Sequence, residues 1–251
     1  MTQTSNSPST SENQTLTAHI VNAFVRHGSG GNPAGVILDA DGFTDAQMLD
    51  IAGKVGLSET AFVSQSPTET IKLDFFTPNR RIAHCGHATV ATFSYLVSIG
   101  RVGEGVASKE TVDGPRKILI KDGAAYMEQL APKYATDADW DADVKNADVL
   151  RSLGLSEDQL DPRVPPTLVN TGNSFLLIAV KDAETLQNII PQQAQIEAIS
   201  EKLDLIGYYV FTTDPAATKN DATSRTFAPR YAIEEEAAPG MAAGPPPGLL
   251  H

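Results

Sequence analysis

Three side chains suited to acid–base, nucleophilic or metal chemistry stand close together at His84, Cys85 and His87. Imidazole titrates near neutral pH, a thiolate is a nucleophile, and both groups can bind zinc. A tetrahedral site built on these three donors needs a fourth one. The remaining histidines of the chain are His19, His27 and the terminal His251. We therefore expect no metal at this cluster, and acid–base or anion-binding chemistry is favoured instead.

A run of small and apolar residues follows the cluster, from Gly86 to Gly100. It is typical of a helix that is buried on most sides, because its apolar members are Val90, Ala91, Phe93, Tyr95, Leu96, Val97 and Ile99. A small-residue turn that enters such a helix leaves unpaired N–H groups at the positive end of the helix dipole. We expect this turn to hold the carboxylate of a small substrate.

The segment from Leu57 to Ser64 predicts a strand with one carboxylate among apolar neighbours. Strict alternation places Glu59 on the same face as Leu57, Ala61 and Val63. An apolar setting raises the pKa of a glutamate from about 4.3 toward neutrality, where the group can accept and donate protons. The alternative interpretation is an ordinary glutamate at the end of a strand.

Turn and capping signals predict the elements that must position these side chains. Thr44 or Asp45 is the expected cap of a helix over residues 45–55, and Gly56 its stop. Strand patterns occur at residues 18–25, 34–39, 57–64 and 71–78, a glycine-rich turn at 27–33, and a hairpin at 117–130 that turns at Asp122 and Gly123.

The composition favours a protein that acts on small molecules. The 251 residues carry a net charge of −12 without a basic run, whereas nucleic acids and anionic membranes are bound largely through clustered Lys and Arg. We therefore expect no nucleic-acid or membrane partner. The sequence shows neither a membrane-spanning stretch nor a targeting segment, and with its single cysteine it favours the cytoplasm.

The second half of the chain repeats the order of the first. Each half has a Gly-Asn turn before an apolar strand, then a helix, two further strands and a second glycine turn. The matched segments are Gly31-Asn32 with Gly172-Asn173, 45–55 with 192–203, 60–64 with 208–212, 74–78 with 225–229, and 86–89 with 240–243. The repeat predicts a disordered tail at 1–16, an N-terminal lobe at 17–131, a connecting excursion at 132–166 with a helix near 147–153, and a partial C-terminal lobe at 167–251.

One asymmetry separates the two halves. More than forty residues of the first lobe follow Gly86, but only eleven residues follow Gly240, and these include Pro245-Pro246-Pro247. Three prolines cannot continue a buried helix, because they lack N–H donors and clash with the preceding turn. We expect an incomplete second lobe whose exposed apolar face leads to aggregation or to a homodimer.

The ordered motifs resemble those of the phenazine-biosynthesis isomerase (PhzF-like) family over roughly residues 18–245. They are Gly-Asn-Pro-Ala-Gly-Val at 31–36, Leu-Ser-Glu-Thr-Ala-Phe at 57–62, Phe-Phe-Thr-Pro at 75–78, Cys-Gly-His-Ala-Thr at 85–89, and Arg-x-Phe-Ala-Pro at 225–229. The resemblance implies an α+β fold shared with diaminopimelate epimerase and proline racemase. In that fold two pseudo-symmetric lobes, each a curved and mostly antiparallel sheet around a central helix, enclose the active site.

The same resemblance implies roles for the first-lobe residues. Glu59 is expected to be the acid/base of a cofactor-free isomerisation that moves a proton between carbons, with His87 assisting in substrate binding and proton handling. The turn at Gly86, Ala88 and Thr89 is expected to bind the substrate's carboxylate. Cys85 matches one of two catalytic cysteines in the related racemases, but a chain with one cysteine cannot be a two-thiol racemase. Cys85 is therefore expected to be a small buried residue.

The second-lobe motif departs from the family pattern Glu-Asp-Pro-Ala-Thr-Gly-Ser. Glu236 replaces the aspartate, Pro239 the threonine and Met241 the serine, whereas Gly240 is retained. Glu236 and Gly240 are the expected substrate contacts in this lobe, although Pro239 removes a turn N–H. The alternative function is therefore a catalytically inactive or incomplete homologue that binds a ligand or partner. A nucleotide-binding loop at 28–33 and a serine-hydrolase elbow are both poorly supported by the motifs.

Overall fold

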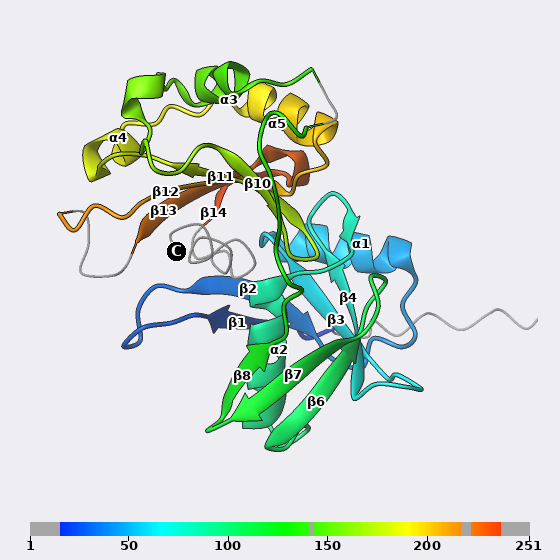
Figure 1. Ribbon diagram of the computed structural model, residues 1–251. Helices are drawn as coiled ribbons and strands as arrows, with labels where there is room; N and C mark the ends of the chain where they lie inside the picture. The colour runs from blue at the N-terminus through cyan, green and yellow to red at the C-terminus, as the bar shows by residue number, and fades with distance from the viewer. Residues whose placement is uncertain (1–15, 141–142, 217–221, 237–251) are drawn as a thin grey trace, which may run out of the picture.

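The computed structural model describes residues 16–140, 143–216 and 222–236, which form two lobes, each built on one sheet (Figure 1). The first lobe contains β1 (His19–Ala23), β2 (Asn32–Ile37), α1 (Asp45–Val55), β3 (Thr60–Ser64), β4 (Ile71–Phe76), β5 (Arg81–Ile82), α2 (Gly86–Ser98), β6 (Gly105–Glu110), β7 (Arg116–Lys121) and β8 (Ala124–Met127). Its strands follow the order β1-β2-β3-β4-β6-β7-β8, with β5 paired to β4. All pairings are antiparallel except β2 with β3 and β4 with β6.

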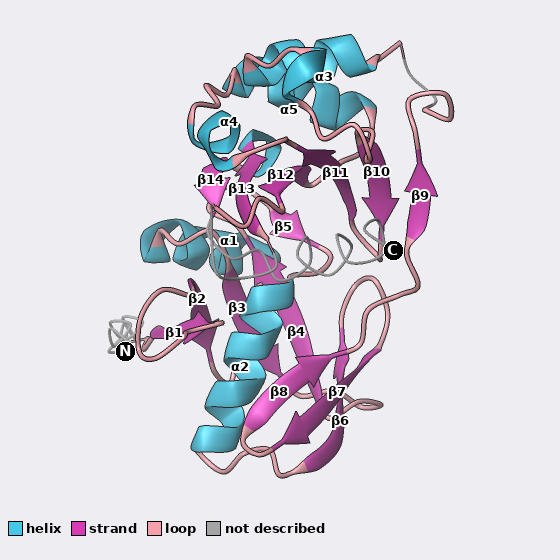
Figure 2. Ribbon diagram, turned by 60° about the vertical axis from the view of Figure 1, so that its left-hand side comes forward, coloured by secondary structure: helices cyan, strands magenta, loops and turns pink. Residues whose placement is uncertain are grey.

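Helix α2 stands inside the curve of this sheet (Figure 2). Its Ala88, Ala91, Phe93 and Leu96 are buried in one cluster with residues from the strands around it. The expected central helix is confirmed, because a segment with so many apolar positions can be stable only when most of its circumference is covered.

Helix α1 covers the other face of the first sheet. Thr44 caps it in a capping box with Gln47, and Gly56 ends it with a left-handed φ of 69°. These bounds confirm the expected helix. Strand β3 is therefore buried on both faces, since Ala61 and Val63 pack in the α2 cluster and Phe62 packs in the α1 cluster.

The second lobe contains β9 (Lys133–Ala135), α3 (Asn146–Leu153), a 3₁₀ turn (Glu157–Gln159), β10 (Thr167–Asn170), β11 (Ser174–Ala179), α4 (Ala183–Gln187), α5 (Gln193–Lys202), β12 (Gly207–Thr212), β13 (Thr223–Ala228), a second 3₁₀ turn (Pro229–Tyr231) and β14 (Ile233–Glu236). The strand order is β14-β13-β12-β11-β10-β9. Only β11 and β12 are parallel, and helices α4 and α5 connect them, as α1 connects the parallel pair β2 and β3. The two lobes thus share the expected order of strands and helices in a mixed α+β fold.

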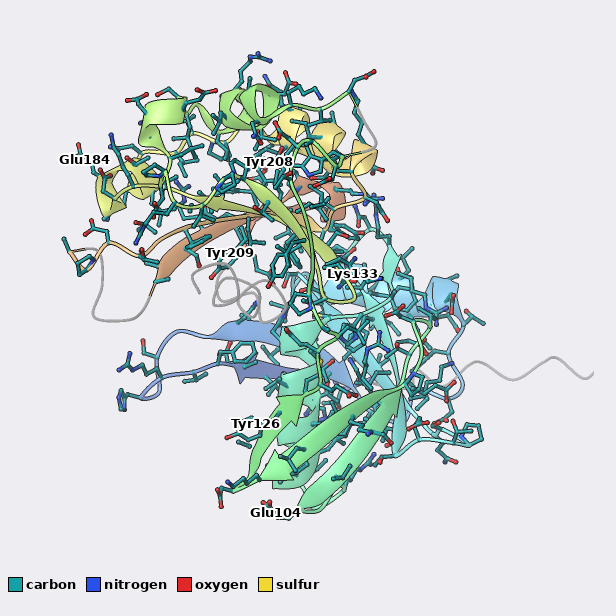
Figure 3. All side chains as sticks on the ribbon, viewed as in Figure 1. Glu104, Tyr126, Lys133, Glu184, Tyr208 and Tyr209 are labelled. Carbon is teal, nitrogen blue, oxygen red and sulfur yellow. The ribbon has the colours of Figure 1, made fainter. Side chains whose placement is uncertain are left out.

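Helices α3, α4 and α5 lie on the side of the second sheet away from the first lobe (Figure 1). Tyr208 and Tyr209 of β12 point to opposite faces (Figure 3), with Tyr208 among residues of the helix-covered side. Tyr209 belongs to the cluster on the other face, with Phe175 and Phe211. Within the described ranges no helix covers this second face, and the expected glycine turn at Gly240 lies outside them.

The segment 132–166 adds structure to the second lobe besides connecting the two halves. Its β9 pairs with β10 at the sheet edge, and Val149 and Leu153 of α3 are fully buried against the sheet. In the part of the chain that is described, no helix is long and apolar enough to cross a bilayer.

Candidate active site

Glu59 directly precedes β3, and the sheet fixes its backbone. The Gly35 N–H donates to the Glu59 carbonyl oxygen at 3.0 Å, and the parallel pairing of β2 with β3 continues from Gly35 and Thr60. A Cβ at Gly35 would lie only 2.8 Å from the Thr60 hydroxyl oxygen, so glycine permits this close approach. The Glu59 side chain is thereby held in the interior, with the residue 6% exposed.

His87 faces Glu59 from the first turn of α2. Its Nε2 lies 3.3 Å from Glu59 Oε2, and within the described residues neither atom has a hydrogen bond of good geometry. Buried polar atoms without partners are uncommon in proteins, and both residues line the same pocket. The hydrogen-bonding capacity of these two atoms is therefore unused at the edge of the pocket.

Glu236 of the second lobe approaches the opposite edge of the same imidazole. Its Oε1 lies 3.4 Å from His87 Nδ1 and accepts a hydrogen bond from Asn32 Nδ2 at 2.6 Å. His87 therefore lies between two carboxyl groups, one from each lobe. This arrangement confines the acid–base groups to the junction of the lobes.

The surroundings of the two carboxyl groups shift their pKa values. Burial, and then the charge of Glu236, raise the pKa of Glu59 to about 8, against an opposing hydrogen bond from Ser58. Burial also raises the pKa of Glu236, although its hydrogen bond from Asn32 acts in the other direction. A carboxyl group with such a pKa exchanges protons readily near neutral pH.

The pKa of His87 shifts in the opposite direction. Burial lowers its pKa to about 4, against the effect of a hydrogen bond with the Pro33 carbonyl. The imidazole is therefore neutral at physiological pH rather than a cation, and it lies between the carboxyl groups of Glu59 and Glu236.

A pocket lined by both lobes opens onto these groups, with an enclosed volume of about 40 Å³ in this structure. The first lobe supplies Glu59, Ile82, His84, Cys85, Gly86 and His87, and the second lobe supplies Asn173, Phe175, Ile206, Tyr231, Ile233 and Glu236. Polar groups thus gather at the start of α2, while most of the second-lobe wall is apolar or aromatic. The lining of the pocket is therefore polar at one end and apolar along one side.

Two further contacts hold the lobes together beside the pocket. Asn173 Nδ2 donates to the His84 carbonyl oxygen at 3.3 Å, and the Arg80 guanidinium lies 5.1 Å from the centre of the Tyr231 ring. Both contacts join the loop between β4 and α2 to the second lobe.

The structure brings part of the expected substrate-binding set into the pocket. Gly86 and Glu236 line it, whereas Ala88 and Thr89 are fully buried in the helix and are not among its lining residues. The Thr89 hydroxyl donates to the Cys85 carbonyl oxygen at 2.5 Å, so it is already committed. The Ala88 N–H interacts with the Cys85 sulfur, so the N–H groups of Gly86 and His87 at the start of α2 are the ones left for an anion. Gly240 lies outside the described residues.

Cys85 is buried, as expected from the single-thiol argument. Burial, with the charges of Glu59 and Glu236, raises the pKa of its thiol well above the usual range, which disfavours the thiolate. Within the described residues Glu59, Cys85 and His87 can each place one ligand atom within 4.8 Å of the others. This set provides three donors, and its thiol is the form that binds metals poorly.

Three polar residues at the site have no role in the sequence-based prediction. Asn32 and Asn173 stand in the matched Gly-Asn turns, so the repeat could have pointed to both as a pair. The sequence indicates His84 only as a possible metal donor, although its place two residues before Gly86 puts it at the same helix entrance.

Comparison with known proteins identifies the family of this chain. The family model for phenazine biosynthesis-like protein matches residues 21–250. The uncharacterized isomerase YddE of Escherichia coli strain K12 is 31% identical over 229 residues, which cover 90% of this chain and 75% of the relative.

Solved structures agree with this match. A phenazine biosynthesis protein of the PhzF family from Bacillus anthracis superposes with a TM-score of 0.77 at 28% identity, covering 91% of this chain and 77% of the other. A predicted epimerase from Pseudomonas aeruginosa shares the fold, with a TM-score of 0.73 at 21% identity and 94% and 81% coverage. The chain therefore belongs to the phenazine biosynthesis-like (PhzF) protein family, which has a diaminopimelate epimerase-like fold and includes relatives named isomerases.

Proposed function

We propose that this protein is a cofactor-independent isomerase that moves a proton between two carbons of a small, carboxylate-bearing substrate. The observation that carries the proposal is the buried pair of Glu59 and His87, whose facing atoms lack hydrogen-bond partners in the described structure and line the pocket between the lobes. The isomerase names of relatives such as YddE support the reaction class.

Glu59 is the acid/base in this mechanism. In its ionised form it removes a proton from carbon, and the resulting carboxylic acid returns that proton to another carbon. One C–H bond breaks and another forms, so the reaction needs no oxidant or reductant. A pKa of about 8 places both protonation states of Glu59 within reach near neutrality.

His87 remains neutral during this cycle and orients the reacting group by hydrogen bonding. The N–H groups of Gly86 and His87 at the start of α2 stabilise the substrate's carboxylate and the negative charge that develops on it. Glu236 closes the site from the second lobe, and its charge adds to the effect of burial in raising the pKa of Glu59.

Proton exchange with solvent tests the proposal. Wild-type protein, dialysed against a chelator, is incubated in D₂O with a panel of cyclic unsaturated acids that resemble dihydro-hydroxyanthranilate, and NMR follows loss of the C–H signals. We expect deuterium incorporation by the wild type and a fall of at least about 100-fold in Glu59→Gln, because that variant cannot take up the proton.

Glu157→Gln is the matched control, because Glu157 is an exposed glutamate in a 3₁₀ turn of the second lobe. It should retain the wild-type rate. Exchange that persists unchanged in Glu59→Gln would exclude Glu59 as the acid/base. Absence of exchange with every acid of the panel, in a wild type that unfolds cooperatively, would favour the inactive ligand-binding homologue.

A further inference from the structure

A groove lies beside α2 where the first sheet stops short of closing around the helix. Strands β1 and β8 are the two edges of that sheet, and in the described structure they do not pair with each other. Helix α2 is seen between these two edges in Figure 2. The groove, called the seam groove below, is lined by Phe24, Gly86, Val90, Ala125, Tyr126, Met127 and Gln129.

The seam groove adjoins the catalytic pocket at Gly86, which lines both. Gly86 is the first residue of α2, and Val90 follows one turn later on the same side of the helix. The seam groove therefore extends along α2 from the N–H groups that are proposed to hold the substrate's carboxylate. Since glycine has no side chain, no side chain at this position separates the two spaces.

The two spaces differ in size and polarity. The catalytic pocket encloses about 40 Å³, little more than the roughly 30 Å³ of one water molecule, whereas the seam groove holds about 210 Å³. A cavity of about 150 Å³ accommodates benzene. Apart from Gln129, the described lining of the seam groove is apolar or aromatic, without a carboxylate or a basic group. The seam groove thus fits an uncharged apolar group of about the size of one ring.

Phe24 is held at the seam groove in an unfavourable backbone conformation. Its φ of 59° lies in the left-handed region, which a bulky residue seldom adopts. Burial does not offset this cost, because Phe24 is 47% exposed, and Tyr126 across the groove is 56% exposed. Backbone strain of this kind gathers at functional sites, and two exposed aromatic rings at one apolar groove are available to a ligand.

We propose that the seam groove is a substrate subsite, which takes an apolar arm of the size of one aromatic ring. The arm belongs to the acid whose carboxylate binds at the start of α2, and it packs against Phe24 and Tyr126 while the reacting carbons stay at Glu59 and His87. This inference rests on the proposed function, since it defines the substrate class of the same site as unsaturated acids with a ring-sized apolar substituent.

Two acids that differ only by such an arm test the subsite. Vinylacetate is the probe without an arm, and styrylacetate is the same unsaturated acid with a phenyl ring added. Isothermal titration calorimetry with the wild-type protein should show that styrylacetate binds at least about tenfold more tightly, because one aromatic ring is partly buried. If another part of the chain or a second copy covered the groove, the ring would add nothing. Equal affinities, or no binding of styrylacetate, would therefore overturn the proposal.

Phe24→Gly removes one wall of the subsite without straining the fold, because glycine adopts a φ of 59° readily. The affinity for styrylacetate should fall by about tenfold, whereas that for vinylacetate should change by less than about twofold. His27→Gly is the matched control. His27 has a φ of 51° in the same connection between β1 and β2, is exposed, and is not among the described lining residues. This variant should bind both acids as the wild type does.

Tyr126→Ala repeats the test from the opposite edge of the sheet. Tyr134→Ala is its control, since Tyr134 is an exposed tyrosine of β9 that is not among the described lining residues. Loss of the preference for styrylacetate in Tyr126→Ala, with retention in Tyr134→Ala, supports the subsite. A preference that survives both Phe24→Gly and Tyr126→Ala would mean that the ring binds elsewhere, and the proposal would be wrong.

These measurements separate the subsite from the isomerase mechanism, because binding of the two acids requires no proton transfer. If Glu59→Gln left deuterium exchange unchanged, the mechanism would be excluded, but a styrylacetate preference that depends on Phe24 would still establish the subsite. Conversely, normal deuterium exchange together with equal affinities for the two acids would keep the isomerase and remove the subsite.

Discussion

At the scale of single residues, the site is unusual for the direction of its pKa shifts. The pKa of Glu59 is raised to about 8 and the pKa of His87 is lowered to about 4, so both side chains are shifted toward their neutral forms in the free protein. Burial is the largest cause in each case, because removing a charge from water favours the uncharged state. The pocket therefore stores a proton on the carboxyl group rather than on the imidazole.

These shifts predict how stability depends on pH. The folded state binds more protons at Glu59 than the unfolded state does between about pH 4.5 and 8, so stability from this group falls as pH rises through that window. His87 binds fewer protons when folded between about pH 4 and 6.5, so its contribution rises with pH there. Below pH 6.5 the contributions of Glu59 and His87 to stability change in opposite directions with pH. Above pH 6.5 only the contribution of Glu59 still changes.

Glu59→Gln should therefore gain stability relative to wild type as the pH increases from 6.5 to 8. The expected slope is on the order of 1 kcal/mol per pH unit, because one pKa unit corresponds to about 1.4 kcal/mol. Urea unfolding of both proteins at several pH values measures the difference, with exposed Glu157→Gln as the reference substitution. A difference that stays constant across this window, or declines, contradicts the raised pKa.

The sequence revealed only some of the residues at the site. Glu59, Gly86 and His87 stand in local motifs and were predicted, and all three line the pocket. The side-chain contact of His84 with Lys109 joins a residue between β5 and α2 to one on β6, 25 positions away, and no spacing rule reveals such a contact.

At the scale of elements, close packing between β2 and β3 decides where Glu59 stands. Helix boundaries were predictable, since Thr44 and Gly56 give local signals that agree with the packing of α1. Strand β6 was not predicted, and its pattern explains why. Val106 is 80% exposed whereas Lys109 is buried, which inverts the apolar-inside alternation used to recognise strands.

Gly35→Ala should disturb both the sheet and the site. The new methyl group would meet the Thr60 hydroxyl at 2.8 Å and a Val55 methyl at 3.0 Å, so the strands must separate slightly. We expect a loss of about 1–3 kcal/mol in unfolding free energy, as for other overpacked positions. Because the Gly35 N–H holds the Glu59 carbonyl, deuterium exchange should fall as well.

Gly42→Ala serves as the matched control for this substitution. An added Cβ at Gly42 meets no atom within 4 Å, and the residue is exposed. Urea unfolding and the exchange assay should both give wild-type values for it. If Gly35→Ala were as stable and as active as Gly42→Ala, the close approach of β2 and β3 would not be required for placing Glu59.

At the scale of the whole molecule, the asparagine of each matched Gly-Asn turn donates a hydrogen bond to a residue of the other lobe at the site. Asn32 of the first lobe donates to Glu236 of the second, and Asn173 of the second lobe donates to the His84 backbone of the first. The repeat predicted the two turns as equivalent but not their contacts, because the relative placement of the lobes depends on packing between distant segments. The pKa of Glu59, which the charge of Glu236 raises, is consequently a property of the assembled lobes.

Glu236→Gln tests this dependence across the lobes. The substitution removes a negative charge that raises the pKa of Glu59, while the Gln Oε1 can still accept the hydrogen bond from Asn32. We therefore expect the pKa of Glu59 to fall from about 8 toward its ordinary value, with burial still holding it above that value. Titration of the ¹³C-labelled Glu59 carboxyl by NMR, assigned through Glu59→Gln, measures the shift directly.

Glu235→Gln is the control for this experiment, because Glu235 is the adjacent acid and pairs with Arg225 at 2.8 Å instead of facing the pocket. It should leave the Glu59 titration unchanged. The two carboxyl groups are coupled, so the wild type should show two titration steps that belong to the pair, and Glu236→Gln should reduce these to one. A single wild-type step that is identical in Glu236→Gln would mean that the second lobe does not influence Glu59. In that case burial in the first lobe alone would have to account for the raised pKa.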